Sequence, residues 1–481
     1  MRTEWGHFIG GASVAGSGML EIVDPAVGEP FASSARGAAA EVDRAVRDAQ
    51  RAWKESWRLR KPAARAEVLF RLSRLILDHL DELSRMESRN TGKPLRSTEA
   101  EVRRAARYFE YYAGAPDKFF GDTGPPEESF LDFTWNEPLG VTAHILPWNF
   151  PLPVLARSVA PALAMGNAVV VKPAEQTPLT ALRAAELAIE AGVPSGVFNV
   201  VTGLGEETGA PLVSHPLVRA VAFTGSVETG RAVLRLAAER IIPVMPELGG
   251  KSPNLVFADA DLDLALENAI QAIFANSGQT CIAGSRLLVE APIRESFAAR
   301  LAERARSLRL GPGETNPDLG PLISEEQRKR VQSYCELAVS EGARLVTGGR
   351  RPAQPDRGFF FEPTIFDRVE PSMRIAREEI FGPVLCILPF RDESEALSLA
   401  NDTGFGLAAG IFSRDLSRVL RLARDIDAGR IFVNQYPSGD VNVPFGGNKE
   451  SGYGRACGIE ALRHFVQVKS VTVRYEGTPT C

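Results

Sequence analysis

The sequence predicts an α/β protein of two lobes, each built around a parallel sheet. Between about residues 139 and 250, short apolar segments that end in Gly or Pro alternate with helical stretches, which is typical of βαβ units. The same alternation resumes at 251 and continues to about 433. The chain has 481 residues. Since a single hydrophobic core rarely grows beyond about 250–300 residues, we expect at least two lobes.

The composition excludes several classes of protein. Hydrophobic residues make up 44% of the chain and charged residues 24%, which rules out a disordered chain, a collagen-like chain and a disulfide-rich miniprotein. The 55 basic and 60 acidic residues leave a net charge of −5, and they form no basic stripe. We therefore expect a small-molecule partner and no nucleic acid.

The chain carries no predicted membrane or export signal. No apolar run approaches the ~18 residues of a membrane helix, and the first residues, MRTEWGHFIGG, lack the regions of a signal peptide. The five cysteines are scattered without CxxC spacing, which argues against a disulfide framework and a structural zinc site. We expect a reduced, cytoplasmic protein with no metal and no membrane contact.

The first third of the chain is predicted to be mostly helical. Apolar side chains recur at helical spacing over residues 39–57 and 65–87, and a third helix is expected over 97–113. Residues 115–138 then begin with turn residues and end in extended character, and 465–475 is a second β-rich piece. These two β segments have no obvious sheet of their own. They can pair with each other, and their edges can continue into another subunit.

The strand–helix repeats follow. The first lobe's strands are the apolar parts of GVTAHILP, NAVVVKPAE, VFNVVTG, RAVAFTGS and IPVMPELGG. Helices over 178–191 and 228–239 lie between them. The second lobe begins with NLVFADA, a long helix over 261–276 and SRLLVE. Because ligands of such sheets bind at the carboxyl ends of the strands, we expect the site at PWN, KPAE, FTGS and ELGG.

Cys281 is the candidate nucleophile. It follows the long helix in NSGQTCIAG, where the neighbouring glycines suggest a tight, exposed loop. The alternative is a buried structural cysteine, which is the commoner fate of a single Cys. Cys335, in a predicted helix, and Cys386, in a predicted strand, have plainer surroundings. None of the five histidines lies in a cysteine-protease signature, so a Cys–His hydrolase is poorly supported.

Two further residues suit the same chemistry. Glu247, in PELGGKS, follows a strand and can act as a general base; the alternative is a surface glutamate in a turn. Asn149, in LPWNFP, is held between Pro147 and Pro151, whose φ angles are fixed. Its amide can stabilise an oxyanion, or it can instead cap the following helix.

Polar residues that follow other strands suit a nucleotide. Lys172 and Glu175 in KPAE can hold a ribose, or they form a solvated pair. Gly225 and Gly230 open a helix after a strand, where a phosphate can bind, although a lone GxxxxG is weak evidence.

Seven motifs occur in one order across about 300 residues: PWNFP, KPAEQTP, FTGS, ELGGKSP, GQTC, EEIFGP and PFGGNKESGYGR. With these motifs, nearly the whole chain resembles the NAD(P)-dependent aldehyde dehydrogenase superfamily. The resemblance implies that the Cys281 thiolate attacks the aldehyde carbon while Asn149 and the Cys281 N–H hold the oxyanion. Hydride passes to the nicotinamide, and Glu247 activates the water that hydrolyses the thioester to a carboxylic acid.

The resemblance also implies the binding residues. The cofactor would be NAD, with NADP as the alternative. It would be held by Trp148, Lys172, Glu175, Gly205, Gly225, Ser226, Gly230, Leu248, Glu379 and Phe381. We expect NAD to be preferred, because the charge of Glu175 repels a 2′-phosphate, although Lys172 offsets part of this repulsion. The aldehyde would contact Arg157, Phe150 and Ile282.

Arg157 follows Asn149 by eight residues, about two helical turns, so its side chain can face the same tunnel. Its planar guanidinium suits a distal carboxylate or polar oxygen of the substrate. The alternative is that Arg157 pairs with an acidic neighbour in the fold or at a subunit contact.

The resemblance divides the chain into three parts. A Rossmann-like NAD-binding domain without GxGxxG covers 1–117 and 138–250, and an α/β catalytic domain covers 251–450. Residues 118–137 and 451–481 form a small β oligomerisation flap, so we expect a homodimer or homotetramer.

One position departs from many relatives, because Ala456 stands in GYGRACG where they carry a glutamate. Glu247 must then act as base more nearly alone. Two alternatives stay open. A CoA-acylating enzyme generally lacks the base, which Glu247 argues against, and a non-catalytic relative is opposed by the intact Cys281 and Asn149.

Overall fold

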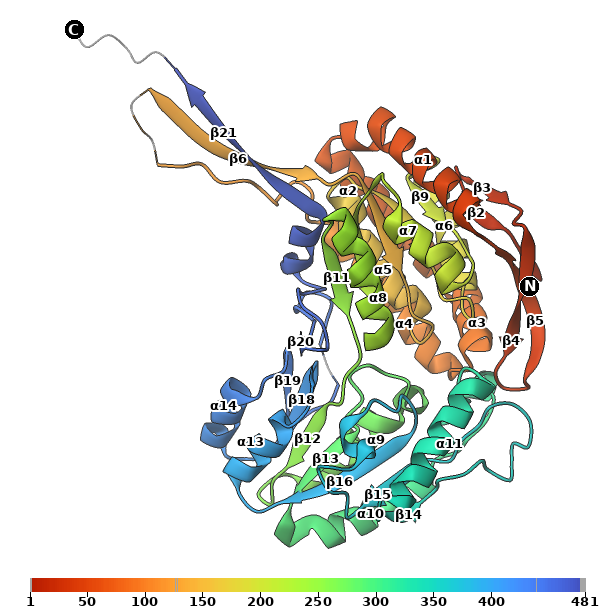
Figure 1. Ribbon diagram of the computed structural model, residues 1–481, viewed down its shortest axis with the longest axis vertical. Coiled ribbons are helices and arrows are strands. Elements are labelled where there is room, and N and C mark those ends of the chain that lie inside the picture. Colours follow the sequence, from red (N-terminus) through yellow and green to blue (C-terminus); the bar gives the residue numbers. More distant parts are fainter. Residues whose placement is uncertain (1, 126, 128, 438, 476–481) are drawn as a thin grey trace.

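The protein has two lobes and a projecting arm in the computed structural model (Figure 1), which describes residues 2–125, 127, 129–437 and 439–475. Helices α1–α8 belong to the upper lobe of the view and the strands β12–β19 to the lower one. The arm consists of β6 and β21, which extend away from the body. Cys481 lies outside the described residues.

Helices are the main elements of the opening third, as predicted, but five strands that were not predicted precede the first helix. They are β1 (Glu4–Trp5), β2 (His7–Ile9), β3 (Ala12–Val14), β4 (Gly18–Asp24) and β5 (Glu29–Arg36). Strands β1, β5 and β4 form a small sheet, and the β2–β3 hairpin extends the edge of the first large sheet through β9. Strands β1–β3 have only two or three residues each, and the longer β4 and β5 are partly exposed, so all five lack the apolar runs by which the other strands were predicted.

Four helices then pack together: α1 (Ala39–Glu55), α2 (Pro62–Asp78), α3 (Leu80–Thr91) and α4 (Leu95–Ala113). The prediction of a single helix over 65–87 is wrong, because α2 ends at Asp78 and α3 begins at Leu80, with His79 between them. The His79 Nδ1 lies 2.9 Å from the carbonyl oxygen of Leu75, at the end of α2. Apolar residues recur on both sides of this break, so the hydrophobic period conceals it.

The first large sheet contains the five predicted parallel strands. They are β7 (Val141–Ile145), β8 (Ala168–Lys172), β9 (Phe198–Val200), β10 (Val218–Thr224) and β11 (Val244–Glu247). The sheet order is β11-β10-β7-β8-β9-β2-β3. Four helices connect these strands: α5 (Pro151–Ala164), α6 (Leu179–Ala191), α7 (Ala210–Ser214) and α8 (Val227–Arg240). The register pairs Ile145 with Lys172 and Thr224 with Glu247, so the carboxyl ends meet at one edge.

The second large sheet has the order β14-β15-β16-β13-β12-β18-β19, and only β14 is antiparallel to its neighbour. Its strands are β12 (Pro253–Val256), β13 (Arg286–Glu290), β14 (Arg344–Thr347), β15 (Thr364–Asp367), β16 (Val384–Phe390), β18 (Ala408–Phe412) and β19 (Arg430–Val433). A small ladder joins β17 (Phe405–Gly406) to β20 (Asn448–Lys449).

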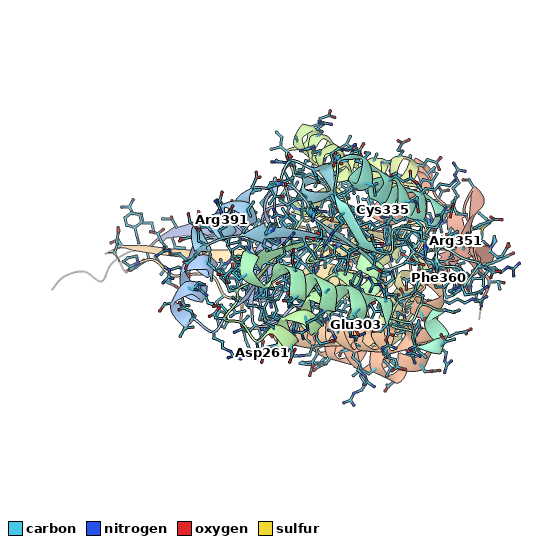
Figure 2. The ribbon with its side chains drawn as sticks, turned by 90° about the horizontal axis from the view of Figure 1, so that it is seen from below. Asp261, Glu303, Cys335, Arg351, Phe360 and Arg391 are labelled. Carbon is cyan, nitrogen blue, oxygen red and sulfur yellow. The ribbon has the colours of Figure 1, made fainter. Side chains whose placement is uncertain are left out.

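Helices cover this second sheet: α9 (Leu262–Phe274), α10 (Arg294–Arg306), α11 (Glu325–Ser340), α12 (Arg374–Arg377), α13 (Glu393–Asn401) and α14 (Leu416–Asp425). The view from below shows Asp261 before α9, Glu303 on α10 and Cys335 on α11 (Figure 2). Cys335 is buried in α11 and Cys386 in β16, as predicted.

The two isolated β segments pair with each other. β6 (Phe130–Pro138) and β21 (Val466–Arg474) form an antiparallel ribbon along their whole length. The boundary proposed at 250 falls between β11 and β12. The domain limits and the oligomerisation role of the ribbon stay predictions. Within the described ranges, no helix is both long and apolar enough to cross a membrane.

Candidate active site

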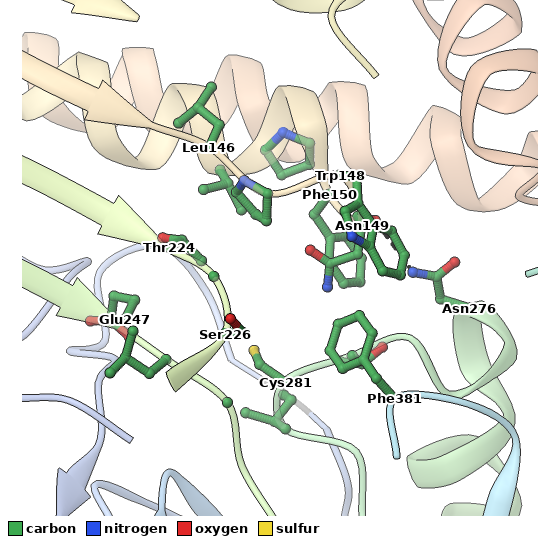
Figure 3. Close-up of a pocket in the computed structure, with 18 of the residues that line it drawn as sticks. Leu146, Trp148, Asn149, Phe150, Thr224, Ser226, Glu247, Asn276, Cys281 and Phe381 are labelled. Atoms are coloured by element: carbon green, nitrogen blue, oxygen red, sulfur yellow. Dashed lines mark hydrogen bonds between the residues drawn. The ribbon is translucent and has the colours of Figure 1, made fainter. Parts of the chain in front are cut away.

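A cavity of about 1390 Å³ is lined by residues of both lobes. The motifs at the carboxyl ends of β7, β8, β10 and β11 all contribute to it, where sheet geometry placed them. Figure 3 shows Cys281, Asn149 and Phe381 around this space, with Glu247 and Thr224 on the side of the strands. The cavity has a cofactor end and a substrate end, which are described in turn after the reacting groups.

Cys281 follows α9 and a short turn (Ala275–Gly278) in which Asn276 and Ser277 adopt left-handed φ angles of 50° and 53°. The loop is tight, as expected, but Cys281 is half-buried and not fully exposed. Burial raises the pKa of its thiol to about 12. Its backbone N–H makes no hydrogen bond to any described residue, so this donor remains available to a ligand.

Asn149 is buried and held by the loop that carries Cys281. Its Nδ2 donates to the carbonyl oxygen of Gln279 at 2.9 Å, and its own carbonyl accepts from Asn276 Nδ2 at 3.3 Å. The helix-cap alternative is wrong, because Glu87 of α3 accepts the hydrogen bond from the N–H of Leu152 at 3.1 Å. An amide nitrogen has two hydrogens, so Asn149 keeps one donor for a ligand.

Glu247 is the last residue of β11 and is buried, with 3% of its surface exposed. The surface-turn alternative is therefore wrong. Neither carboxylate oxygen has a well-formed hydrogen bond within the described part of the chain. Burial raises the pKa of Glu247 to about 7, although the positive charge of Arg157 opposes this shift. The group is thus close to half ionised near neutral pH.

Arg157 lies on α5 at the same cavity. Its Nη2 donates to Thr224 Oγ1 at 3.2 Å, and Thr224 is the register partner of Glu247 on the adjacent strand. Its guanidinium also lies 5.2 Å from the centre of the Phe445 ring. Among the described residues no carboxylate comes within 4.0 Å of it, so the acidic pairing considered from the sequence does not occur within this chain.

The cofactor end is lined by most of the predicted residues. Lys172 is buried, and its Nζ lies 3.1 Å from Oε2 of Glu175, whose side chain is 35% exposed, so solvent reaches the pair only on the Glu175 side. Ser226 is the N-cap of α8 and accepts from the N–H of Thr229 at 3.2 Å. The cavity is also lined there by Trp148, Gly205, Gly225 and Leu248.

Gly230 has a different role from the one expected. It is not among the cavity-lining residues, and a Cβ there would lie 2.5 Å from Leu248 Cδ2. Gly230 therefore lets α8 pack closely against the loop after β11 and acts on the cofactor end only through Leu248.

Glu379 and Phe381 reach the same end from the second lobe. Glu379 Oε1 accepts from the N–H of Gly250 at 3.0 Å, and burial raises the pKa of Glu379 to about 7. A Cβ on Gly249 would lie 2.1 Å from Glu379 Oε2, so only glycine leaves room for this carboxylate. Phe381 has a φ of 61°. The centres of the Phe381 and Trp148 rings lie 5.2 Å apart, in an edge-to-face arrangement.

Several residues of the site were missed. Gln327 of α11 donates to the carbonyl oxygens of Ile380 and Phe381, and Arg330 donates to that of Glu379 at 2.9 Å. At the substrate end the cavity is lined by Phe150, Arg157 and Ile282, as expected, and also by Arg104, Tyr108, Arg430, Phe432, Phe445 and Cys457. No local motif marks these additional residues, since they come from segments far apart in the chain.

A family model described as the aldehyde dehydrogenase family matches residues 13–471. A hydroxyisobutyraldehyde dehydrogenase of Mycolicibacterium austroafricanum is 44% identical over 458 residues, which cover 95% of this chain and 91% of that protein. A betaine aldehyde dehydrogenase of Bacillus subtilis is 41% identical over 456 residues, with 94% and 93% coverage.

Solved structures agree with these relatives. A putative aldehyde dehydrogenase from Burkholderia cenocepacia has a TM-score of 0.96 at 47% identity, with 98% of this chain and 100% of that chain covered. An NAD⁺ complex of an aldehyde dehydrogenase from Bacillus cereus has a TM-score of 0.97 at 40% identity, with 98% and 97% coverage. The fold and the cavity thus define a two-lobed α/β dehydrogenase. The chain belongs to the aldehyde dehydrogenase family.

Proposed function

We propose that this protein oxidises an aldehyde to the carboxylic acid, with NAD as hydride acceptor and a thioester on Cys281 that water hydrolyses. The observation that carries the proposal is the convergence of Cys281, Asn149 and Glu247 on one cavity. These side chains come from loops that are distant in the chain, and together they supply a nucleophile, an oxyanion donor and a base.

The cofactor end fits a dinucleotide. The glycine at 249 leaves the Glu379 carboxylate room beside the cavity, where it can accept a hydrogen bond from a ribose hydroxyl. Helix α8 has 14 residues, and its N-terminus lines the cavity, which favours a phosphate. The solved relative from Bacillus cereus is described as an NAD⁺ complex, which supports NAD. The nicotinamide, when bound, supplies the hydride acceptor.

The first half of the reaction uses Cys281 and Asn149. The thiol releases its proton to solvent, and the sulfur forms a bond to the aldehyde carbon while the carbonyl π electrons move to the oxygen. The free hydrogen of the Asn149 amide and the free N–H of Cys281 can both donate to this oxyanion. One such donor is typically worth about 2.7–4 kcal/mol. When hydride leaves the carbon, the C=O bond re-forms and a thioester remains.

The second half uses Glu247. Its carboxylate accepts a proton from water as the water oxygen attacks the thioester carbon, and the Cys281 sulfur leaves with the electrons of the C–S bond. A carboxyl with a pKa of about 7 suits this role near neutral pH. Ala456 is buried and carries no acid, so Glu247 is the base that the cavity offers at this point.

The two alternatives are less well supported. In a CoA-acylating enzyme the acyl group leaves on a thiol, and a buried base beside the thioester has no evident use. A non-catalytic relative would not need both the free Cys281 N–H and the buried carboxylate of Glu247. A cytoplasmic location and assembly as a homodimer or homotetramer belong to the same proposal.

The test is NADH formation, followed by absorbance, on mixing the protein with NAD and a panel of aldehydes. We expect turnover by the unaltered protein. The Cys281→Ala variant should lose aldehyde oxidation and keep NAD binding, since the sulfur is used in the reaction and not in cofactor recognition. Cys335→Ala, which removes a buried thiol outside the cavity, is the matched control. Substantial oxidation by Cys281→Ala would refute the assignment.

A further inference from the structure

We infer that the substrate of this enzyme is an aldehyde with an anionic group such as a carboxylate at its far end, and that aldehydes bearing a quaternary ammonium are rejected. The inference rests on the proposed function, because it concerns the substrate end of the same cavity.

The substrate end carries an excess of cationic side chains. It is lined by Lys93, Arg104, Arg157 and Arg430, against the acidic Glu101, Glu247 and Asp440. Glu101 is ion-paired with Lys93, and Asp440 lies 3.9 Å from Arg107, which does not line the cavity. Glu247 is the proposed base. The carboxylates other than the base thus already have cationic partners.

Two of these guanidinium groups therefore have no carboxylate of the described residues within the 4.0 Å of an ion pair, although Arg104 feels the charge of Glu101 and Arg157 that of Glu247. Arg104 is an exposed residue of α4 and makes no hydrogen bond or ion pair with any residue that the structure describes. Arg157 lies deeper, where its hydrogen bond is to the neutral hydroxyl of Thr224. A guanidinium presents a planar fork of N–H groups that matches a carboxylate. A substrate anion would supply the negative charge that these groups lack.

The aromatic side chains point to the same conclusion. Recognition of a quaternary ammonium requires open aromatic faces that the cation can approach. Three phenylalanine rings of the substrate end already have a cation of the protein over them. Lys93 lies 4.3 Å from the centre of Phe150, Arg157 lies 5.2 Å from Phe445, and Arg430 lies 5.2 Å from Phe432. A second cation at these faces would be repelled.

The names of the relatives do not predict a preference for an anionic aldehyde. Several are described as betaine aldehyde dehydrogenases at 41–45% identity, and betaine aldehyde carries a trimethylammonium group. The inference rests on the charged side chains that line the cavity of this chain and not on the names of those relatives.

The test compares matched pairs of aldehydes by kcat/KM with NAD. The first pair is succinic semialdehyde and its uncharged isostere, in which an isopropyl group replaces the carboxylate. The second pair is betaine aldehyde and its uncharged isostere, in which a tert-butyl group replaces the trimethylammonium. The two aldehydes of a pair have nearly the same size, so the ratio of their kcat/KM values reports the effect of the charge on the substrate. We expect the carboxylated aldehyde to be preferred by about tenfold or more, and the ammonium aldehyde to be disfavoured by a similar factor.

Variants identify the groups responsible. Arg104→Leu and Arg157→Leu should each lower the ratio for the carboxylate pair several-fold, through a higher KM for succinic semialdehyde. Arg103→Leu is the matched control, since Arg103 is an exposed neighbour on α4 that does not line the cavity, and it should keep the ratio. Thermal melting of each variant separates a loss of binding from a loss of fold.

The outcomes are distinct. Equal kcat/KM values within the carboxylate pair, or efficient turnover of betaine aldehyde, would overturn the inference while leaving aldehyde oxidation by Cys281 intact. An equal fall in the ratio for Arg103→Leu would also overturn it, because a general surface charge would then explain the preference. No oxidation of any of the four aldehydes by a folded protein would instead count against the proposed function and the inference together.

Discussion

At the scale of single residues, burial moves the pKa values of the two groups that must lose or accept a proton far from their usual values. The Cys281 thiol has a pKa of about 12 and the Glu247 carboxyl one of about 7. The sequence argument required an activated thiolate at Cys281. A thiol with a pKa of about 12 is protonated near neutral pH, so we expect its activation to accompany the binding of substrate or cofactor. Arg157 is the cation that favours both ionised forms.

The pH dependence of thioester hydrolysis should therefore follow Glu247. Only the carboxylate can accept a proton, so hydrolysis is expected to rise as the pH passes about 7 and to level off above it. Arg157→Leu removes the cation that lowers the pKa of Glu247, so the midpoint should move to higher pH, whereas Arg157→Lys should restore it. Single-turnover hydrolysis of the acyl-enzyme across a pH series measures this.

The control for this profile is Glu247→Gln, which should abolish the rise and leave an acyl adduct on Cys281 that mass spectrometry detects. A midpoint that is the same in Arg157→Leu and in the unaltered enzyme would contradict the electrostatic role. Unchanged steady-state turnover of Glu247→Gln would mean that another group activates the water.

Cofactor choice is also decided by single charges. The Glu175 side chain is 35% exposed at the cofactor end and would repel the 2′-phosphate of NADP. Glu175→Gln should therefore lower the NAD-to-NADP ratio of kcat/KM by about tenfold, which corresponds to ~1.4 kcal/mol. Glu190→Gln, an exposed position on α6, is the control. Comparable kcat/KM values for the two cofactors in the unaltered enzyme would refute the expected preference.

At the scale of elements, the loop after β11 connects the two halves of the site. Glu247 ends the strand, and the next residues leave room for a side chain of the second lobe. Gly249 leaves this room because it has no Cβ, and Glu379 Oε2 occupies the place where a Cβ would lie. The Glu379 loop is in turn held by α11 through Gln327 and Arg330. A substitution in one lobe should therefore act on a cofactor contact made by the other.

Gly249→Ala tests this connection. The added Cβ would displace the Glu379 carboxylate, so we expect a weaker grip on NAD, by roughly 5- to 30-fold in KM if a hydrogen bond worth about 1–2 kcal/mol is lost. Gly209→Ala is the matched control, because a Cβ there meets nothing within 4 Å. Titration of NAD by intrinsic fluorescence gives the affinity directly. An unchanged affinity in Gly249→Ala would show that Glu379 does not contact the cofactor.

At the scale of the whole molecule, the β6–β21 ribbon leaves the body and presents an apolar face. Pairing of Trp135 with Lys469 and of Leu131 with Val473 sets which side chains share that face. Trp135 is 51% and Leu131 42% exposed. Exposed apolar patches and open strand edges are places where proteins associate. The ribbon therefore suits contact with another subunit, and this role stays a prediction.

A double substitution on this face should reduce assembly. Trp135→Lys with Val473→Lys would place charges on the apolar face, and we expect a smaller particle by size-exclusion chromatography with light scattering. Ser470→Lys, on the opposite face of the ribbon, should leave the size unchanged. Equal particle sizes for the double variant and the control would show that subunits do not meet through this face.

The sequence by itself determined the α/β class and the segments whose strands end at the site, and its resemblance to a known family proposed the reacting groups. Apolar runs ending in Gly or Pro predict buried parallel strands, and such strands align their carboxyl ends at one edge. These features are local, so a single sequence contains them. The same reasoning missed β1–β5 and the break at His79, because short, half-exposed strands and a concealed helix end have weak local patterns.

Only the tertiary structure decided how those groups behave. Asn149 is held by Gln279, which is 130 residues away in the chain, and Glu247 has its raised pKa because packing removes it from water. The cations over aromatic rings likewise arise from helices and loops that meet only in the folded chain. Burial and electrostatic interactions depend on distances in space, and residue types along the chain do not contain those distances.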